Sequence, residues 1–181
     1  MPLLTPEDCL LIVVDAQPGF ADGDLAEAAL ERAVWLTALA AALEVPVVVT
    51  EEEPEANGHT DPRFTLPPGT PVLVKPTFGL AGTPEILSAV RATGRPTAVL
   101  VGFETDVCVF QSAVGLLDEG FGVVAVEDAV FSPGEMHARG LARLRDAGVR
   151  LTHAKSLAYE WARTVERARV LREIGPAPFR L

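Results

Sequence analysis

Three side chains that could form a nucleophilic site lie far apart in the sequence. They are Asp15, Lys75 and Cys108, and each follows a short, mostly apolar segment. A deprotonated thiol is a nucleophile, an ammonium group stabilises the thiolate, and a carboxylate can accept the thiol proton and pass it to a leaving group. If the fold brings these groups into one cleft, the chemistry that they favour is acyl transfer to sulfur.

The segment around Cys108 has the pattern of a buried strand that turns into a helix. Residues 97–101 are mostly apolar and rich in β-branched side chains, and Gly102 follows them. Thr105 or Asp106 is expected to cap the helix. Cys108 would then lie in the first turn, where free N–H groups and the helix dipole stabilise an anion. The alternative interpretation is a cysteine that only packs as a small hydrophobe.

Asp15 and Lys75 end two further predicted strands, residues 9–14 and 72–74. Open α/β sheets bind their ligands at the carboxyl ends of the strands. Taken alone, Asp15 could be a turn-forming carboxylate and Lys75 a solvated lysine. If the first and fourth strands are neighbours, however, Asp15, Lys75 and Cys108 converge on one crevice.

Six predicted strands alternate with helices along the chain. The strands are expected at residues 9–14, 45–50, 72–74, 97–101, 122–126 and 149–152, and the helices at 25–43, 84–92, 105–120, 134–147, 156–162 and 166–174. This alternation predicts an α/β fold with three α/β/α layers and a doubly wound, six-stranded, mainly parallel sheet. Residues 54–71, rich in Pro, Gly and charge, are expected to form a loop over the sheet, and the helix at 166–174 to pack on a partner subunit or on its own domain.

Length and composition restrict the class of protein. The 181 residues favour a single domain, 1–181. No apolar run is long enough for a membrane span and no leader pattern appears, so we expect a cytoplasmic protein with no membrane partner. The net charge of −10 argues against a nucleic-acid partner. The two cysteines have no spacing that indicates a disulfide framework or a zinc site.

Several motifs together resemble one enzyme family. They are Asp15-x-Gln17 after the first strand, Lys75-Pro76-Thr77-Phe78 after the third, residues 102–109 with Ser112-Ala113 and Gly120, and Val126-Glu127-Asp128-Ala129. This set resembles the isochorismatase-like cysteine hydrolase superfamily over nearly the whole chain, most specifically around the cysteine. The Val49-Thr50-Glu51 end of the second strand is similar to the branch of small hydrolases without a known physiological substrate.

The resemblance implies a function and a site. Asp15, Lys75 and Cys108 take the positions of the catalytic triad, and the backbone N–H groups of Glu104 and Cys108 form the oxyanion hole. It also implies a non-proline cis peptide just before Glu104 and a homo-oligomer, a dimer or larger. Members of the family hydrolyse small amides through a thioester, whereas isochorismatases proper cleave a vinyl ether and typically lack the cysteine. The resemblance thus implies an amidohydrolase acting on a small-molecule substrate.

The second strand departs from the metal-binding members of the superfamily. Nicotinamidases bind a metal through an Asp-x-His pair and a further histidine, whereas residues 50–53 here read Thr-Glu-Glu-Glu and His59 stands in the wrong order for the pair. We therefore expect no metal, no other cofactor and no nicotinamidase activity. The expected pocket lining lies near the same strand ends and comprises Phe20, Thr50, Glu51 and Phe78.

Other functions fit the sequence less well. An idle binding or assembly protein on the same scaffold is one alternative, although an intact triad counts against it. A vinyl-ether hydrolase of the isochorismate type is another, and Cys108 counts against that. A phospho-acceptor receiver domain would need an aspartate where the chain has Lys75. A dinucleotide-binding domain would need a Gly-x-Gly-x-x-Gly turn after the first strand, and the sequence has none there.

Overall fold

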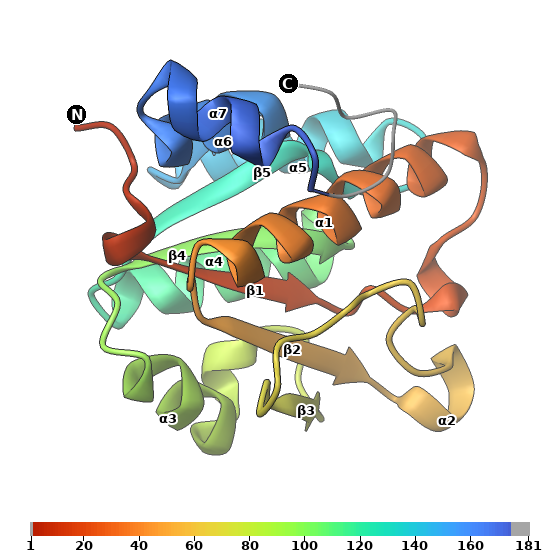
Figure 1. The fold of residues 1–181 in the computed structure, drawn as a ribbon. Coiled ribbons are helices and arrows are strands. Elements are labelled where there is room, and N and C mark those ends of the chain that lie inside the picture. Colours follow the sequence, from red (N-terminus) through yellow and green to blue (C-terminus); the bar gives the residue numbers. More distant parts are fainter. Residues whose placement is uncertain (1, 175–181) are drawn as a thin grey trace.

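The structure, a computed structural model, describes residues 2–174 and is built around one parallel sheet (Figure 1). The strands are β1 (Cys9–Val14), β2 (Val47–Glu52), β3 (Val72–Lys75), β4 (Thr97–Phe103), β5 (Gly122–Phe131) and β6 (Arg150–Thr152). They lie in the order β3-β2-β1-β4-β5-β6 and every neighbouring pair is parallel. The doubly wound, six-stranded sheet is thus confirmed, with β1 and β4 adjacent at the point where the strand order reverses.

Helices cover both faces of the sheet (Figure 1). On one face lie α1 (Asp24–Ala42), α6 (Ala154–Ala162) and α7 (Val165–Leu171), and on the other α3 (Pro84–Ala92), α4 (Phe110–Asp118) and α5 (Met136–Asp146). Alternate residues of β1 enter the two cores: Leu11 and Val13 pack toward α1, and Leu10 and Ile12 toward α3 and α4. A strand buried on both faces explains the continuous apolar run. None of the described helices combines the length and apolar character needed to cross a membrane.

Several boundaries differ from those expected. Strand β2 runs on to Glu52, and the loop after it contains a short helix, α2 (Pro54–Asn57). The helix after β4 begins with a π-helical turn, Thr105–Val109, and neither Thr105 nor Asp106 caps it. Instead, the Thr105 hydroxyl forms a hydrogen bond with His137 Nδ1, and the Asp106 carboxylate accepts one from the Ser132 hydroxyl. The carboxyl-terminal helix α7 packs on its own chain, against α6.

The contact between β1 and β4 is unusually close at Gly102. This residue pairs with Val14 and has φ of +109°, and a Cβ built on it would stand 2.0 Å from the Val14 carbonyl oxygen. Only glycine fits such an approach. Because Asp15 follows Val14 and the turn to Cys108 follows β4, this contact brings the two segments of the site together.

Candidate active site

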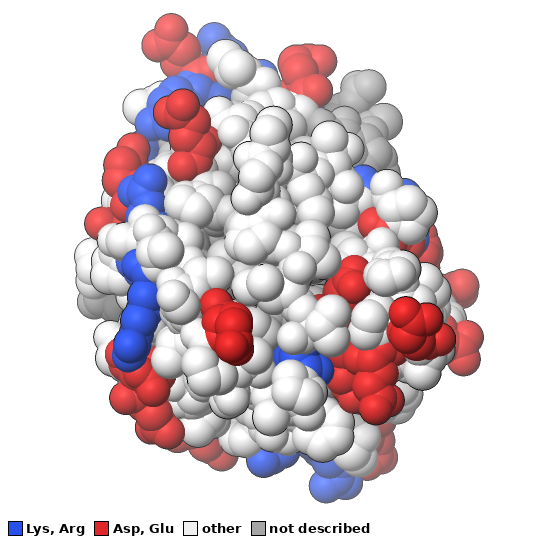
Figure 2. Space-filling model, turned by 90° about the horizontal axis from the view of Figure 1, so that it is seen from below, with Lys and Arg blue, Asp and Glu red and all other residues white. Residues whose placement is uncertain are grey.

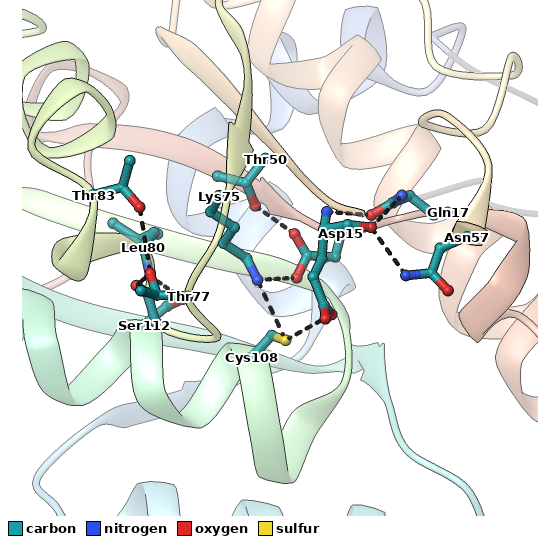
Figure 3. Close-up of polar contacts among 12 residues, drawn as sticks. Asp15, Gln17, Thr50, Asn57, Lys75, Thr77, Leu80, Thr83, Cys108 and Ser112 are labelled. Atoms are coloured by element: carbon teal, nitrogen blue, oxygen red, sulfur yellow. Dashed lines mark hydrogen bonds and ion pairs between the residues drawn. The ribbon is translucent and has the colours of Figure 1, made fainter. Parts of the chain in front are cut away.

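Asp15, Lys75 and Cys108 meet at the carboxyl ends of β1, β3 and β4 (Figure 3). The Lys75 ammonium lies 2.7 Å from Asp15 Oδ2 and 3.5 Å from Cys108 Sγ. All three residues are buried. The chain therefore places an acid, a cation and a thiol in mutual contact, as the positions of these residues at strand ends predict.

Thr50 holds the carboxylate from the neighbouring strand. Its hydroxyl donates a hydrogen bond of 2.9 Å to Asp15 Oδ1, and Lys75 forms the ion pair with Oδ2 (Figure 3). Asp15 is thus held through both of its oxygens, by Thr50 on the β2 side and by Lys75.

The electrostatics of the thiol differ from the sequence-based expectation. Burial, followed by the charge of the Asp15 carboxylate, raises the pKa of Cys108 to about 12, although Lys75 opposes both effects. Burial likewise raises the pKa of Asp15, against the opposing charge of Lys75. The expectation that Lys75 makes the thiol acidic is therefore wrong for this arrangement, because desolvation and the carboxylate outweigh one ammonium group. At neutral pH Cys108 holds its proton beside a carboxylate that can accept it.

Glu52, which sequence reasoning did not select, also faces the thiol. Its Oε2 atom lies 3.8 Å from Cys108 Sγ. The backbone of Glu52 is fixed on both sides: its N–H donates to Gln17 Oε1 at 2.7 Å, and its carbonyl accepts from Gln17 Nε2 and Asn57 Nδ2, each at 3.0 Å (Figure 3). Thr50 and Glu52 lie two positions apart in β2, and both side chains bond groups of the triad. That alternation is the signal in the sequence that could have identified Glu52.

A cavity of about 380 Å³ opens beside the triad. It is lined by Glu52, Glu53, Val74, Lys75, Pro76, Thr77 and Phe78. Of the four side chains expected to line the pocket, Phe78 does so, and Thr50 lies behind Asp15. Phe20 packs against the apolar core on the α1 side and is not part of this lining.

Glu51, the fourth expected lining residue, fixes the following loop. Its carboxylate accepts hydrogen bonds of 2.7 Å from the N–H and the hydroxyl of Thr60 and lies 3.0 Å from His59 Nδ1. Burial raises the pKa of Glu51, but these hydrogen bonds outweigh it and hold the pKa below its ordinary value. Glu51 thus anchors the loop that covers the carboxyl end of β2.

The turn before Cys108 has the backbone geometry that the resemblance implies. The peptide between Phe103 and Glu104 is cis. The Glu104 carbonyl accepts hydrogen bonds from the N–H groups of Val107 and Val109, at 3.2 and 3.0 Å. Burial, followed by the charges of Asp106 and Glu52, raises the pKa of the Glu104 carboxyl group. The role of the Glu104 and Cys108 amides as an oxyanion hole remains a prediction.

One group of described residues has donor atoms close enough together to hold a metal ion. It comprises Asp15, Glu52 and Cys108, whose ligand atoms lie within 4.8 Å of one another. The Lys75 ammonium contacts two of these three residues. A divalent cation at the same place would have to approach that ammonium closely, which like charges oppose. The donor set therefore fits a metal poorly, and the metal-free site stays a prediction.

Comparison with known proteins identifies the family. Residues 9–156 match the isochorismatase domain. The chain belongs to the isochorismatase family. Among its relatives, isochorismatase domain-containing protein 2 of Rattus norvegicus is 31% identical over 155 residues, which cover 84% of this chain and 72% of the rat protein. As a member of the isochorismatase family, the protein is a hydrolase.

Solved structures agree with this assignment. The MAR1 ribonuclease of Caenorhabditis elegans is similar with a TM-score of 0.86 and 25% identity, covering 99% of this chain and 97% of the other. YcaC of Pseudomonas aeruginosa, solved with hexane-2,5-diol and covalent acrylamide, has a TM-score of 0.84 and 25% identity, covering 93% and 90%. The isochorismatase-like fold therefore extends over essentially the whole chain.

Proposed function

We propose that this isochorismatase-family hydrolase cleaves the C–N bond of a small amide through a thioester on Cys108, with Asp15 and Lys75 completing a catalytic triad. The observation that carries the proposal is the buried Lys75 ammonium in contact with both the Asp15 carboxylate and the Cys108 sulfur, beside a cavity of about 380 Å³. A cavity of this size suits a small molecule.

In the first half of the reaction, Cys108 Sγ attacks the amide carbonyl carbon and Asp15 accepts the thiol proton. The raised pKa of the thiol favours transfer of the proton as the S–C bond forms, so that no free thiolate accumulates. The carbonyl oxygen becomes an oxyanion held by the N–H groups of Glu104 and Cys108. When the C–N bond breaks, Asp15 returns the proton to the departing nitrogen, which leaves as ammonia or an amine.

In the second half, water attacks the thioester carbon. Asp15, again a carboxylate, accepts a proton from this water, and the C–S bond breaks to release a carboxylic acid. The sulfur takes the proton back from Asp15, which restores the starting state. Lys75 keeps Asp15 in place and balances its charge throughout, because their ion pair is buried and close.

The covalent acrylamide named for Pseudomonas YcaC supports a reactive nucleophile in this fold, although a thiol adds to the C=C bond of acrylamide and leaves the amide intact. Acrylamide is a small amide, and its covalent capture by a protein of the same fold indicates a nucleophile within reach of such molecules. The name of the Caenorhabditis elegans neighbour raises a ribonuclease as an alternative. The net charge of −10 opposes a phosphate-rich substrate here. A vinyl-ether hydrolase would have no role for the Cys108 thiol, and an idle binding protein would have none for the buried contacts of Lys75 with Asp15 and Cys108.

Replacement of Cys108 by Ala tests the proposal. We expect it to lower the turnover of primary amides and ureido acids by about a thousandfold or more, since the nucleophile is lost. Turnover and the trapped thioester are both measured, the latter by intact-protein mass. An unchanged circular dichroism spectrum controls for folding, and a chelator should leave the wild-type rate unchanged. Turnover retained by the variant would remove the nucleophile assignment, and a chelator effect reversed by zinc would contradict the metal-free mechanism.

A further inference from the structure

We infer that the substrate of this site is a cationic amide, whose ammonium or amidinium group lies against the Glu52 carboxylate. The inference rests on the proposed amide hydrolysis and goes beyond it by naming the charge of the substrate and the side chain that recognises it. It also assigns a binding role to Glu52, a residue outside the triad.

The positive charge in the site is already neutralised. Lys75 is the one basic residue in the cavity lining, and its buried ammonium pairs with Asp15 at 2.7 Å. The triad with a protonated thiol thus has no net charge. An anionic substrate would find no free cation on the described walls of this cavity.

The charges that remain at the cavity are negative. Glu52 and Glu53 line it, and no Lys, Arg or His among residues 2–174 forms an ion pair with either of them. Glu104 is close enough to Glu52 for the Glu52 charge to contribute to the raised pKa of the Glu104 carboxyl group. Figure 2 shows acidic side chains gathered at the end of the molecule where α2 lies, on the right of the view. The cavity mouth therefore attracts cations and repels anions.

Glu52 has a fixed position, unlike an ordinary surface acid. The Gln17 side chain bonds both its N–H and its carbonyl, and Asn57 bonds the carbonyl again. Its carboxylate lies 3.8 Å from the sulfur that attacks the substrate and belongs to a partly buried residue. A carboxylate on a backbone fixed at both its N–H and its carbonyl starts from a defined place beside the sulfur, which reduces the freedom that it loses on binding a charged partner.

The geometry also limits the length of the substrate. A charge-assisted hydrogen bond places a substrate nitrogen about 2.8 Å from Glu52, and attack requires the carbonyl carbon about 3 to 3.5 Å from the sulfur. Because Glu52 and the sulfur are themselves close, only a few bonds can separate the two substrate groups. Short amino amides such as 3-aminopropanamide meet this requirement.

Thiol-specific reagents test the charge preference without any need for turnover. The 2-aminoethyl and 2-sulfonatoethyl methanethiosulfonates differ in charge, and each forms a mixed disulfide with Cys108 while methanesulfinate and the thiol proton leave. For each thiol we compare the rate constant of the cationic reagent with that of the anionic reagent. We expect this ratio of rate constants to be at least tenfold higher for Cys108 than for 2-mercaptoethanol, which is the gain due to the site. Glu52→Gln should abolish most of this gain. Glu55→Gln, which removes an equal charge from an exposed position on α2, should preserve it.

A ratio at Cys108 equal to that of 2-mercaptoethanol, or one that Glu52→Gln does not change, would overturn the inference. The labelling is followed over a pH series up to about pH 10, because the raised pKa of Cys108 slows it at neutral pH. If neither reagent modifies Cys108 in the folded protein at any pH of the series although both do so after unfolding, the cavity does not reach the sulfur. Both the charge preference and the proposed nucleophile would then be wrong.

Turnover of matched amides provides the second test. The compounds 3-aminopropanamide, butanamide and succinamate share a backbone and carry a positive, no and a negative charge. We expect kcat/KM to fall in that order, and the advantage of the cation over butanamide to shrink at least tenfold in Glu52→Gln but not in Glu55→Gln. Amide turnover without this order would overturn the inference and leave the proposed function standing. A cation preference of the thiol reagents without any amide turnover would remove the amidase function instead.

Discussion

At the scale of single residues, the site is a protonated thiol beside a buried ion pair. The pKa of Cys108 is raised to about 12 by burial and then by Asp15, and Lys75 alone lowers it. Asp15 therefore has two opposing effects. It suppresses the resting thiolate, and in the proposed reaction it is the base that accepts the thiol proton. The structure predicts that these two effects can be separated by mutation.

Asp15→Asn should lower amide turnover by about a hundredfold or more, because the base is lost. The same change should accelerate alkylation of Cys108 by iodoacetamide at pH 7 about tenfold, the equivalent of one pKa unit. The sign follows from the charges: without the carboxylate, the ammonium of Lys75 is the charge nearest the sulfur, and the thiolate appears at lower pH. Peptide mapping across a pH series measures the alkylation rate.

Cys9 is the internal control, since burial raises its pKa to about 11 and Asp15 is not among the groups that affect it. The exposed aspartate Asp22 supplies the matched variant, Asp22→Asn, which should leave the Cys108 profile unchanged. An Asp15→Asn profile that stays in place or moves to higher pH would show that the carboxylate does not hold the proton on the sulfur.

At the scale of secondary-structure elements, two close backbone contacts position Cys108, the proposed nucleophile. Gly102 lets β4 approach β1. Gly140 lets α5 approach the turn that carries Cys108, since a Cβ on Gly140 would stand 2.9 Å from the Asp106 nitrogen. Both contacts join segments distant in the sequence and involve the backbone. The relative placement of Asp15 and Cys108 is therefore a property of packed elements rather than of either side chain.

Gly102→Ala should cost about 3 kcal/mol or more of unfolding free energy, because overpacking and a positive φ both oppose the new methyl group. Gly122→Ala is the matched control: its Cβ would meet the Thr97 hydroxyl at 3.4 Å, an ordinary contact, on a strand beside β4. Urea unfolding of both variants gives the comparison. Equal stabilities would mean that β1 and β4 are not as close as described.

At the scale of the whole molecule, the sheet has an uncovered edge at β3. Within residues 2–174 this strand pairs only with β2, and its Val72 and Val74 side chains are exposed, as is Phe78 just beyond it. Exposed edge strands with apolar side chains readily pair with other chains. The homo-oligomer suggested by the family resemblance is thus expected to use this edge, next to the mouth of the active-site cavity.

Val72→Lys should shift the protein to a smaller species in light scattering coupled to size exclusion, since a charge on the edge opposes pairing. Val72 does not line the active-site cavity, so amide turnover can be followed in the same variant. The control is Val165→Lys, at an exposed valine on α7 away from this edge. A monomeric wild type, or an oligomer that only Val165→Lys disrupts, would contradict the use of β3.

The sequence by itself determined the fold class and the triad candidates. Apolar runs bounded by turn residues locate the strands, and ligands bind at the ends of parallel strands, so Asp15, Lys75 and Cys108 could be selected without coordinates. Only the tertiary structure decided which neighbouring side chains face them. The side chain of Glu51 bonds the loop, while those of Thr50 and Glu52 face Asp15 and Cys108. The pairing of β2 with β1 and β3 decides which of its alternating side chains point toward the site. The raised pKa of Cys108 likewise depends on burial and on charges brought together by folding, which no local pattern encodes.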